Sequence, residues 1–157
     1  MNNRYHQLMG ALAQSYDCDK QKLITGEPLL VNGVTFRFEH NSIIATERLV
    51  VYCQYGEIPE QHETDACKAL LEANLLLFCS RGPGTVFTLS PEDGKVWLAD
   101  SHDLNTLSLP ELTEYLSRTV AQVELWQQDY FLTQPIDEQV AEPQSKTTLS
   151  KHITAVP

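Results

Sequence analysis

The sequence has few basic residues, few cysteines and no long apolar run. Lysine and arginine together number 11, against 21 aspartate and glutamate residues, which gives a formal net charge of −10. Most of such a surface repels polyanions, so we expect neither nucleic acid nor an anionic membrane as a partner. No apolar stretch reaches the ~18 residues that suggest a membrane-spanning helix. These absences favour a cytoplasmic protein, and 157 residues suffice for one hydrophobic core.

Motifs for catalysis and for metal binding are also missing. No two cysteines form a C-x-x-C pair, and no His or Cys pair has zinc-ligand spacing with a second pair to match it. His62 with Cys67 or Cys79 leaves a cysteine hydrolase open, but no nucleophile motif surrounds either cysteine. Gly82-Pro83-Gly84 lacks the Gly-Lys-Ser/Thr ending of a phosphate loop. We therefore expect a binding protein without a metal or cofactor, and not an enzyme.

The first half of the chain predicts a helix followed by three strands. From Tyr5 to Tyr16, apolar residues recur at steps of three and four, which is typical of an amphipathic helix. Asn32-Gly33 lies between two runs rich in β-formers, and this pair favours a tight hairpin turn. The segment from Arg48 to Tyr55 is apolar on both faces, which predicts a strand covered on two sides.

The second half predicts a helix, a hairpin and a final helix. The helix covers about Thr64 to Phe78, and the hairpin strands Thr85–Leu89 and Lys95–Asp100 flank a turn that contains Pro91 and Gly94. The fold class is therefore α+β: helix, three strands, helix, two strands, helix, with a twisted antiparallel sheet.

A capping-box pattern marks the start of the final helix, with Ser108 followed three residues later by Glu111. Its periodic apolar face consists of Leu112, Leu116, Val120, Val123, Trp126 and Tyr130. Beyond Leu132 the chain is rich in Gln, Thr, Ser, Pro and Lys. Such a composition buries little apolar surface, so we predict one domain over residues 1–132 and a flexible C-terminal tail over residues 133–157.

The predicted middle helix carries more apolar surface than docking on one core requires. One face holds Ala66, Leu70, Ala73 and Leu77, and the adjacent face holds a second apolar row. Either the final helix covers the second row, or the row contacts another subunit. We expect a homodimer, and its predicted interface residues are Cys67, Leu71, Asn74, Leu75 and Phe78. The amide of Asn74 could bond across the dimer axis or to backbone groups of a nearby loop.

The block "LLEANLLL", a glycine-containing break and "TVFTLSPEDGKVWL" resemble the type III secretion chaperones of the CesT/Tir-chaperone family. The likeness covers roughly residues 5 to 131. The matching positions are Leu70, Leu71, Glu72, Ala73, Asn74, Leu75, Gly84, Leu89, Pro91, Gly94 and Val96.

This resemblance implies a homodimer, centred on the middle helix, that binds the N-terminal segment of a secreted effector in extended form. Such a client is expected to pair with a sheet edge and to anchor its apolar side chains in pockets. The predicted client-binding residues are Leu8, Leu12, Val34, Phe36, Phe38, Val50 and Tyr52. Trp97 and Trp126 are either partner anchors or core residues. A regulatory protein of the same fold, which sequesters a regulator of secretion genes, remains the alternative.

Overall fold

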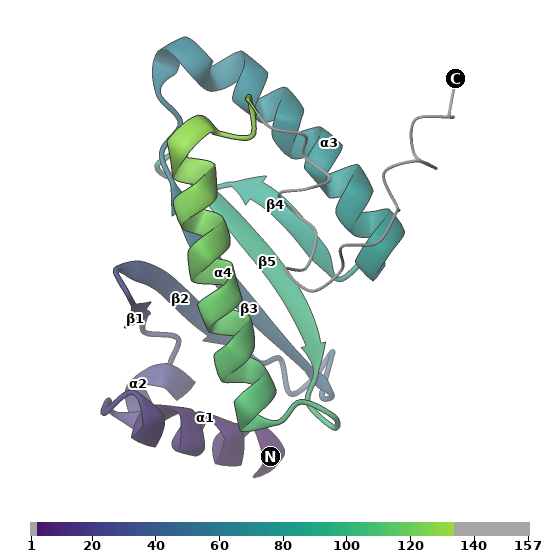
Figure 1. Ribbon diagram of the computed structural model, residues 1–157. Coiled ribbons are helices and arrows are strands. Elements are labelled where there is room, and N and C mark those ends of the chain that lie inside the picture. Colours follow the sequence, from purple (N-terminus) through teal and green to yellow (C-terminus); the bar gives the residue numbers. More distant parts are fainter. Residues whose placement is uncertain (1–2, 134–157) are drawn as a thin grey trace.

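The computed structural model describes residues 3–133 and consists of one sheet with four α-helices (Figure 1). The helices are α1 (Asn3–Ser15), α2 (Lys20–Ile24), α3 (Glu63–Arg81) and α4 (Leu109–Asp129), and a short 3₁₀ turn, η1 (Glu60–His62), precedes α3. The strands are β1 (Leu29–Val31), β2 (Val34–Glu39), β3 (Arg48–Gly56), β4 (Thr85–Leu89) and β5 (Val96–Asp103). The predicted α+β class and the predicted order of the main elements are confirmed.

The five strands form one antiparallel sheet in the order β1-β2-β3-β5-β4. Asn32 and Gly33 make the turn between β1 and β2 with φ values of 48° and 81°. These positive values explain the Asn-Gly pair, because asparagine and glycine tolerate the left-handed region best. The order leaves β1 and β4 at the two edges of the sheet.

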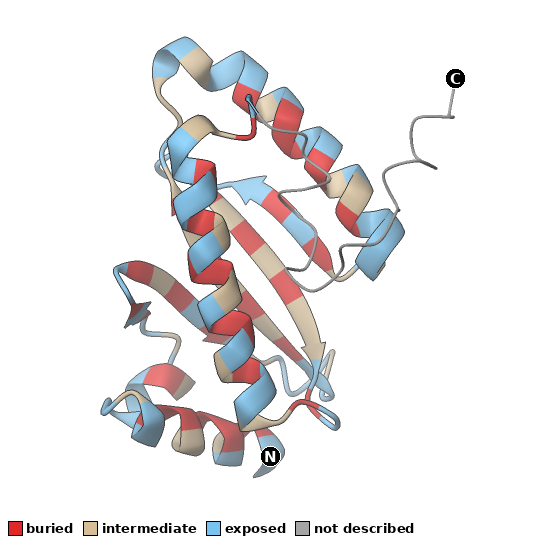
Figure 2. Cartoon of the chain, viewed as in Figure 1, coloured by how far each residue is buried: buried red, intermediate tan, exposed pale blue. Residues whose placement is uncertain are grey.

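The core lies between one face of the sheet and the helices. In β3, Leu49, Val51, Cys53 and Tyr55 are buried, and they alternate with residues that are partly exposed (Figure 2). Helix α4 crosses this face of the sheet, whereas α3 lies alongside β4 (Figure 1). Trp126 of α4 is fully buried and contacts the Tyr55 ring edge-on, with 5.8 Å between the ring centroids. Trp126 is therefore a core residue.

In the N-terminal half of the chain, one sequence prediction was wrong and one short helix was not predicted. The strand β3 is not covered on two sides, because Val50, Tyr52 and Gln54 on its second face are only half-buried. The short helix α2 was missed, since five residues are too few to show a helical period. Asp19 caps this helix by accepting a hydrogen bond from the Gln21 backbone N–H at 2.8 Å.

The start of α4 and the end of α3 follow local signals in the sequence, although α3 continues to Arg81, beyond the predicted end at Phe78. Ser108 and Glu111 form the capping box at the start of α4. Helix α3 ends at Gly82, whose φ of 80° lies in the region that glycine adopts without steric cost. The predicted tail lies outside the described residues, apart from Thr133.

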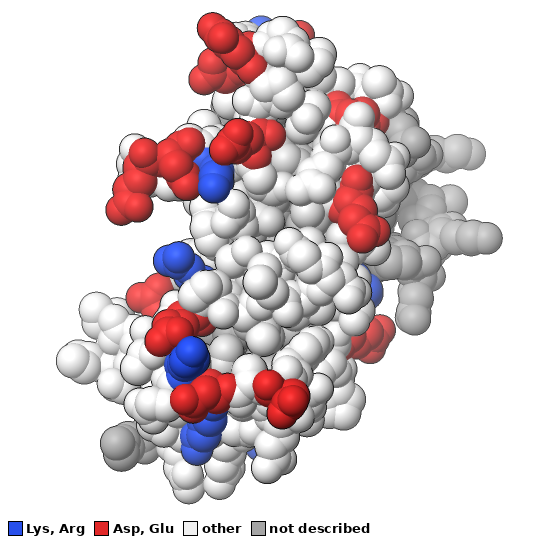
Figure 3. Space-filling model, turned by 90° about the vertical axis from the view of Figure 1, so that its left-hand side faces the viewer, with Lys and Arg blue, Asp and Glu red and all other residues white. Residues whose placement is uncertain are grey.

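Acidic groups dominate the surface that faces left in Figure 1, and an uncharged area lies between them (Figure 3). Within residues 3–133, no helix is both long enough and apolar enough to cross a membrane.

Candidate protein-interaction surfaces

Helix α3 exposes a row of large apolar side chains. Leu71, Leu75 and Phe78 are 69%, 63% and 59% exposed, respectively. The opposite face is buried against the sheet through Ala66, Ala69, Leu70, Ala73 and Leu77. The alternative in which the final helix covers the exposed row is therefore wrong for the part of the chain that the structure describes. We call Leu71, Leu75 and Phe78 the α3 apolar row; the predicted interface residue Cys67 is half-buried.

Asn74 is bonded within its own chain. Its Nδ2 donates to the Phe87 carbonyl oxygen at 3.0 Å, and its Oδ1 accepts from the Phe87 N–H at 2.6 Å. Of the two possibilities for this amide, the bond across a dimer axis is contradicted by these two bonds, and bonding to nearby backbone groups is observed. The groups belong to an edge strand and not to a loop. Asn74 thus occupies the main-chain position at β4 where a further strand would pair.

Replacing Asn74 with alanine is expected to lower the free energy of unfolding by about 2–3 kcal/mol. The change leaves the Phe87 N–H and carbonyl without these partners, and an unsatisfied buried polar group costs roughly 1–3 kcal/mol. Urea unfolding at one fixed protein concentration measures the loss. Asn41→Ala is the matched control, because the Asn41 amide bonds only within an exposed loop. Equal effects of the two substitutions would contradict the role of Asn74.

Five of the seven predicted client-binding residues are core residues. Two of them, Leu8 and Leu12, are buried residues of α1. The other three are buried on the helix side of the sheet: Val34, Phe36 and Phe38. Val34, Phe36 and Phe38 share one face of the sheet as predicted, but that face is the one that the helices cover. We therefore no longer assign them to client binding.

The two remaining predicted residues lie on the opposite face of the sheet, which we call the outer face. Val50 and Tyr52 are half-buried there, and the cross-strand register pairs Tyr52 with Arg37 and with Ala99. The Arg37 guanidinium carbon lies 5.7 Å from the centroid of the partly exposed Trp97 ring. Tyr52 and Trp97 line a hollow of about 840 Å³ beside the β4–β5 turn. The sequence predictions did not include Arg37 among the site residues. Its position between Phe36 and Phe38 was the available signal, because neighbouring residues of a strand point to opposite faces.

The β1 edge of the sheet adjoins this outer face. Leu30 is 66% exposed, and β1 pairs only with β2 among the described strands. Residues Val31 and Val34 flank the two-residue turn, so the alternating bonds of the ladder direct the Leu30 backbone groups outward. Within residues 3–133, no strand pairs with the outer side of this edge.

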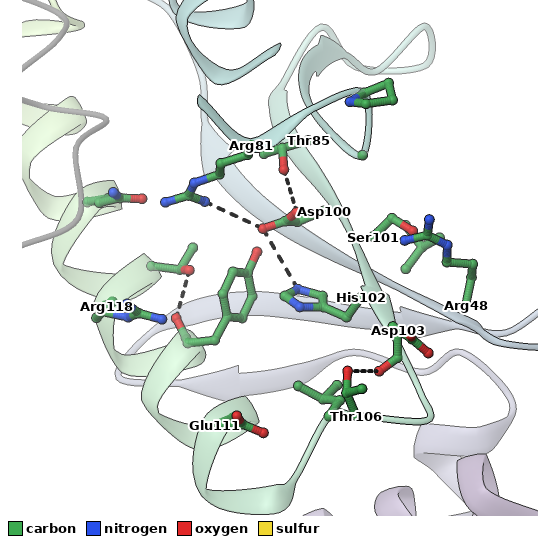
Figure 4. A pocket seen from close by; sticks show the side chains of 17 residues that line it. Arg48, Arg81, Thr85, Asp100, Ser101, His102, Asp103, Thr106, Glu111 and Arg118 are labelled. Carbon is green, nitrogen blue, oxygen red and sulfur yellow. Dashed lines mark hydrogen bonds and ion pairs between the residues drawn. The ribbon is translucent and has the colours of Figure 1, made fainter. Parts of the chain in front are cut away.

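A polar pocket of about 760 Å³ lies where the C-terminal end of β5 meets α4 and the end of α3 (Figure 4). Buried Asp100 accepts a hydrogen bond from the Thr85 hydroxyl at 2.6 Å. Arg81 Nη1 and His102 Nε2 both lie 3.7 Å from the second carboxylate oxygen. The pKa of His102 is lowered by burial and by Arg81, although the Asp100 carboxylate acts in the opposite direction.

Of the four cysteines, Cys53 is buried, Cys67 is half-buried, and Cys18 and Cys79 are exposed. Burial raises the pKa of the Cys53 thiol far above its ordinary value, which keeps it protonated. Within residues 3–133, no group of three His, Cys, Asp or Glu side chains could hold a metal ion.

Comparison with solved structures finds several chains of similar fold. A chain of the ExsC–ExsE complex superposes with a TM-score of 0.64 at 16% identity, covering 85% of this chain and 98% of that one. A chain of the HopA1–SchA chaperone–effector complex gives 0.58 at 18% identity, with 81% and 95% covered. A chain of the ExoT–SpcS complex from Pseudomonas aeruginosa gives 0.55 at 21% identity, with 80% and 98% covered. At these identities the likeness shows the fold alone.

Comparison of sequences gives two results. No curated protein sequence matches this chain. The model of the Tir chaperone protein (CesT) family matches residues 29–127, which run from β1 almost to the end of α4. This match covers more than half of the chain and agrees with the observed fold, so the chain belongs to the Tir chaperone protein (CesT) family of type III secretion chaperones.

Proposed function

We propose that this protein is a cytosolic type III secretion chaperone that binds the N-terminal region of an effector in extended form. It keeps that region soluble and competent for export. The observation that carries the proposal is a sheet with one open edge and one uncovered face, on a fold of this family. The mechanism is binding without a chemical step.

Homodimerisation is the first part of this proposal. The α3 apolar row leaves large side chains in water on a helix whose other face already packs on the core. Burying a leucine or phenylalanine side chain contributes about 1.5–3 kcal/mol, so a row of three repeated by a two-fold axis provides a substantial driving force. Because Asn74 is engaged with β4, the row and Cys67 form the proposed interface without the amide.

Client binding is the second part. An extended segment can pair with β1 through main-chain hydrogen bonds, which require no particular sequence. Its side chains on one side then lie over the outer face, where Tyr52 and Trp97 offer aromatic surface. Strand pairing supplies affinity, and the hollows beside the aromatic rings supply selectivity.

Tyr52→Glu is expected to weaken client capture at least about tenfold, a loss of ~1.4 kcal/mol in binding free energy. The new carboxylate has to lose its hydration under an apolar client, whereas in the free protein it stays in contact with water. The experiment is a pull-down from the native cells with wild-type and variant protein, followed by mass spectrometry. The fold and mass of the variant are checked by circular dichroism and light scattering.

Gln128→Glu adds the same charge to an exposed position of α4 and serves as the matched control. The proposal predicts that wild type and Gln128→Glu enrich one exported protein, that Tyr52→Glu loses it, and that its N-terminal segment alone is sufficient for binding. Enrichment of a gene regulator in place of an exported protein would favour the regulatory alternative. Full capture by a folded Tyr52→Glu variant would remove the outer face from the client site.

A further inference from the structure

The open edge of the sheet and the hollow on the outer face adjoin each other. β1 pairs only with β2 among the described strands, and the Leu30 side chain is 66% exposed. Thr25 and Gly26, which lie shortly before β1 in the chain, line the hollow together with Tyr52 and Trp97. β1 lies at the left of Figure 1, and Figure 3 shows that side of the molecule with an uncharged area between acidic groups. A segment that covers β1 therefore also meets the rim of the hollow.

The hollow carries more negative than positive charge. Its lining includes three carboxylates, those of Glu39, Glu92 and Asp93, against the side chains of Arg37 and Lys95. Lys95 Nζ lies 3.7 Å from an Asp93 carboxylate oxygen, and the Arg37 guanidinium lies over the Trp97 ring. Within residues 3–133, no ion pair involves Glu39 or Glu92. This surface favours an occupant with positive charge.

One stretch of this acidic chain has the opposite charge. Residues 143–157, PQSKTTLSKHITAVP, contain Lys146 and Lys151 and no acidic residue. The stretch is rich in threonine and has an isoleucine and a valine, and β-branched residues favour an extended strand. In such a strand Leu149, Lys151 and Ile153 share one side, because successive side chains alternate. A side that is apolar and basic complements an outer face that is aromatic and acidic. We call residues 146–156 the basic segment.

The chain between α4 and the basic segment is long enough to reach β1. Near the end of α4, Gln127 Nε2 donates to the Tyr55 carbonyl oxygen at 2.8 Å, at the end of β3. The register of β2 with β3 brings the β1–β2 turn to this same end of the sheet. Two strand spacings separate β3 from β1, about 10 Å. The twelve residues 134–145 span up to ~40 Å, so the basic segment can lie along β1 of its own chain.

We propose that the basic segment binds the β1 edge and the adjoining outer face of its own chain when no client is present. The outward-facing backbone groups of Leu30 pair with the segment, and Leu149, Lys151 and Ile153 lie toward the outer face. Because both partners belong to one chain, the effective concentration of the segment is about 1 mM. A local dissociation constant of roughly 0.1 mM then keeps the edge covered about nine-tenths of the time. Such a cover also keeps the open edge from pairing with other chains.

The consequence for client binding rests on the proposed chaperone function. The client and the basic segment compete for the same edge, so the client has to displace the segment. With the edge free for about a tenth of the time, the apparent affinity for every client falls about tenfold. The segment therefore excludes weakly binding polypeptides and leaves the surface to clients that bind more tightly.

Hydrogen exchange of the Leu30 backbone N–H, followed by NMR in the full chain without client, tests the proposal. This N–H points away from β2, so pairing at the edge slows its exchange. Ile153→Asp is expected to speed up this exchange about tenfold, because its carboxylate loses hydration against the sheet and meets negative charge there. Lys151→Glu is expected to act in the same direction. Ile136→Asp, the same substitution outside the basic segment, is the matched control and is expected to change nothing.

Three results would overturn the proposal. The first is equal exchange of the Leu30 N–H in wild type, Ile153→Asp and Lys151→Glu. The second is an equal effect of Ile136→Asp, which would show that the basic segment has no special part. The third is protection that grows with protein concentration, because a segment from a second copy would then cover the edge, whereas binding within one chain is independent of concentration.

The exchange measurement and the client pull-down fail independently. Ile153→Asp is expected to raise client capture by up to about tenfold, since it removes the competitor. Client capture by a wild-type chain whose Leu30 N–H is unprotected would reject only the basic segment. Protection of this N–H without capture of any exported protein would reject the chaperone proposal and leave the intramolecular contact intact.

Discussion

Replacing Leu75 with aspartate is expected to convert the proposed homodimer into a monomer or an aggregate. Leu75 lies in the middle of the α3 apolar row and is 63% exposed in the single chain, so it is free to be buried by a second copy. A carboxylate without a partner at a dry interface costs several kcal/mol. The apolar contacts that remain around the substituted position cannot offset this cost. Light scattering on the wild-type chain is expected to give a mass near twice 17.7 kDa.

The control for this substitution is Leu125→Asp. Leu125 is also an exposed leucine on a helix, but it lies on α4 and outside the apolar row. We expect Leu125→Asp to remain dimeric with an unchanged helical signal. A wild-type chain that is monomeric at micromolar concentration, or a Leu75→Asp variant that stays dimeric, would show that α3 is not the interface.

Phe36→Ala is expected to lower the free energy of unfolding by about 3–5 kcal/mol, the usual cost of truncating a buried phenylalanine. Phe36 is fully buried on the helix side of the sheet, opposite Cys53 in the register. The empty space cannot be filled by small movements, because strands on one side and helices on the other hold the neighbouring side chains. Urea unfolding at a fixed protein concentration measures the loss, since the proposed dimerisation would make stability concentration-dependent.

Tyr52→Ala on the outer face provides the comparison. Tyr52 is only half-buried, so its truncation is expected to cost about 1 kcal/mol, the typical effect of a single substitution. The pair of variants separates the core face of the sheet from the proposed client face. If Phe36→Ala kept full stability and lost the client, the assignment of Phe36 to the core would be wrong.

Local signals determined most of the element order. The two-residue period of Val34, Phe36 and Phe38 placed them on one face, and the helical period of α3 separated two apolar faces, because both periods follow from backbone geometry alone. The Ser108–Glu111 capping box and the Asn32-Gly33 turn acted through hydrogen bonds or torsion angles of adjacent residues. Each of these signals lies within a few positions of its effect.

The tertiary structure alone decided which of these faces is core and which is surface. The periodicity of a strand gives the same pattern whether helices or a client cover its apolar face, so it could not show that Phe36 lies under the helices and that Tyr52 does not. The pairing of Asn74 with Phe87 and the meeting of Arg81, His102 and Tyr115 join segments 13 to 34 residues apart. Such contacts depend on how the elements pack, because no local period or spacing records the distance between residues on different elements.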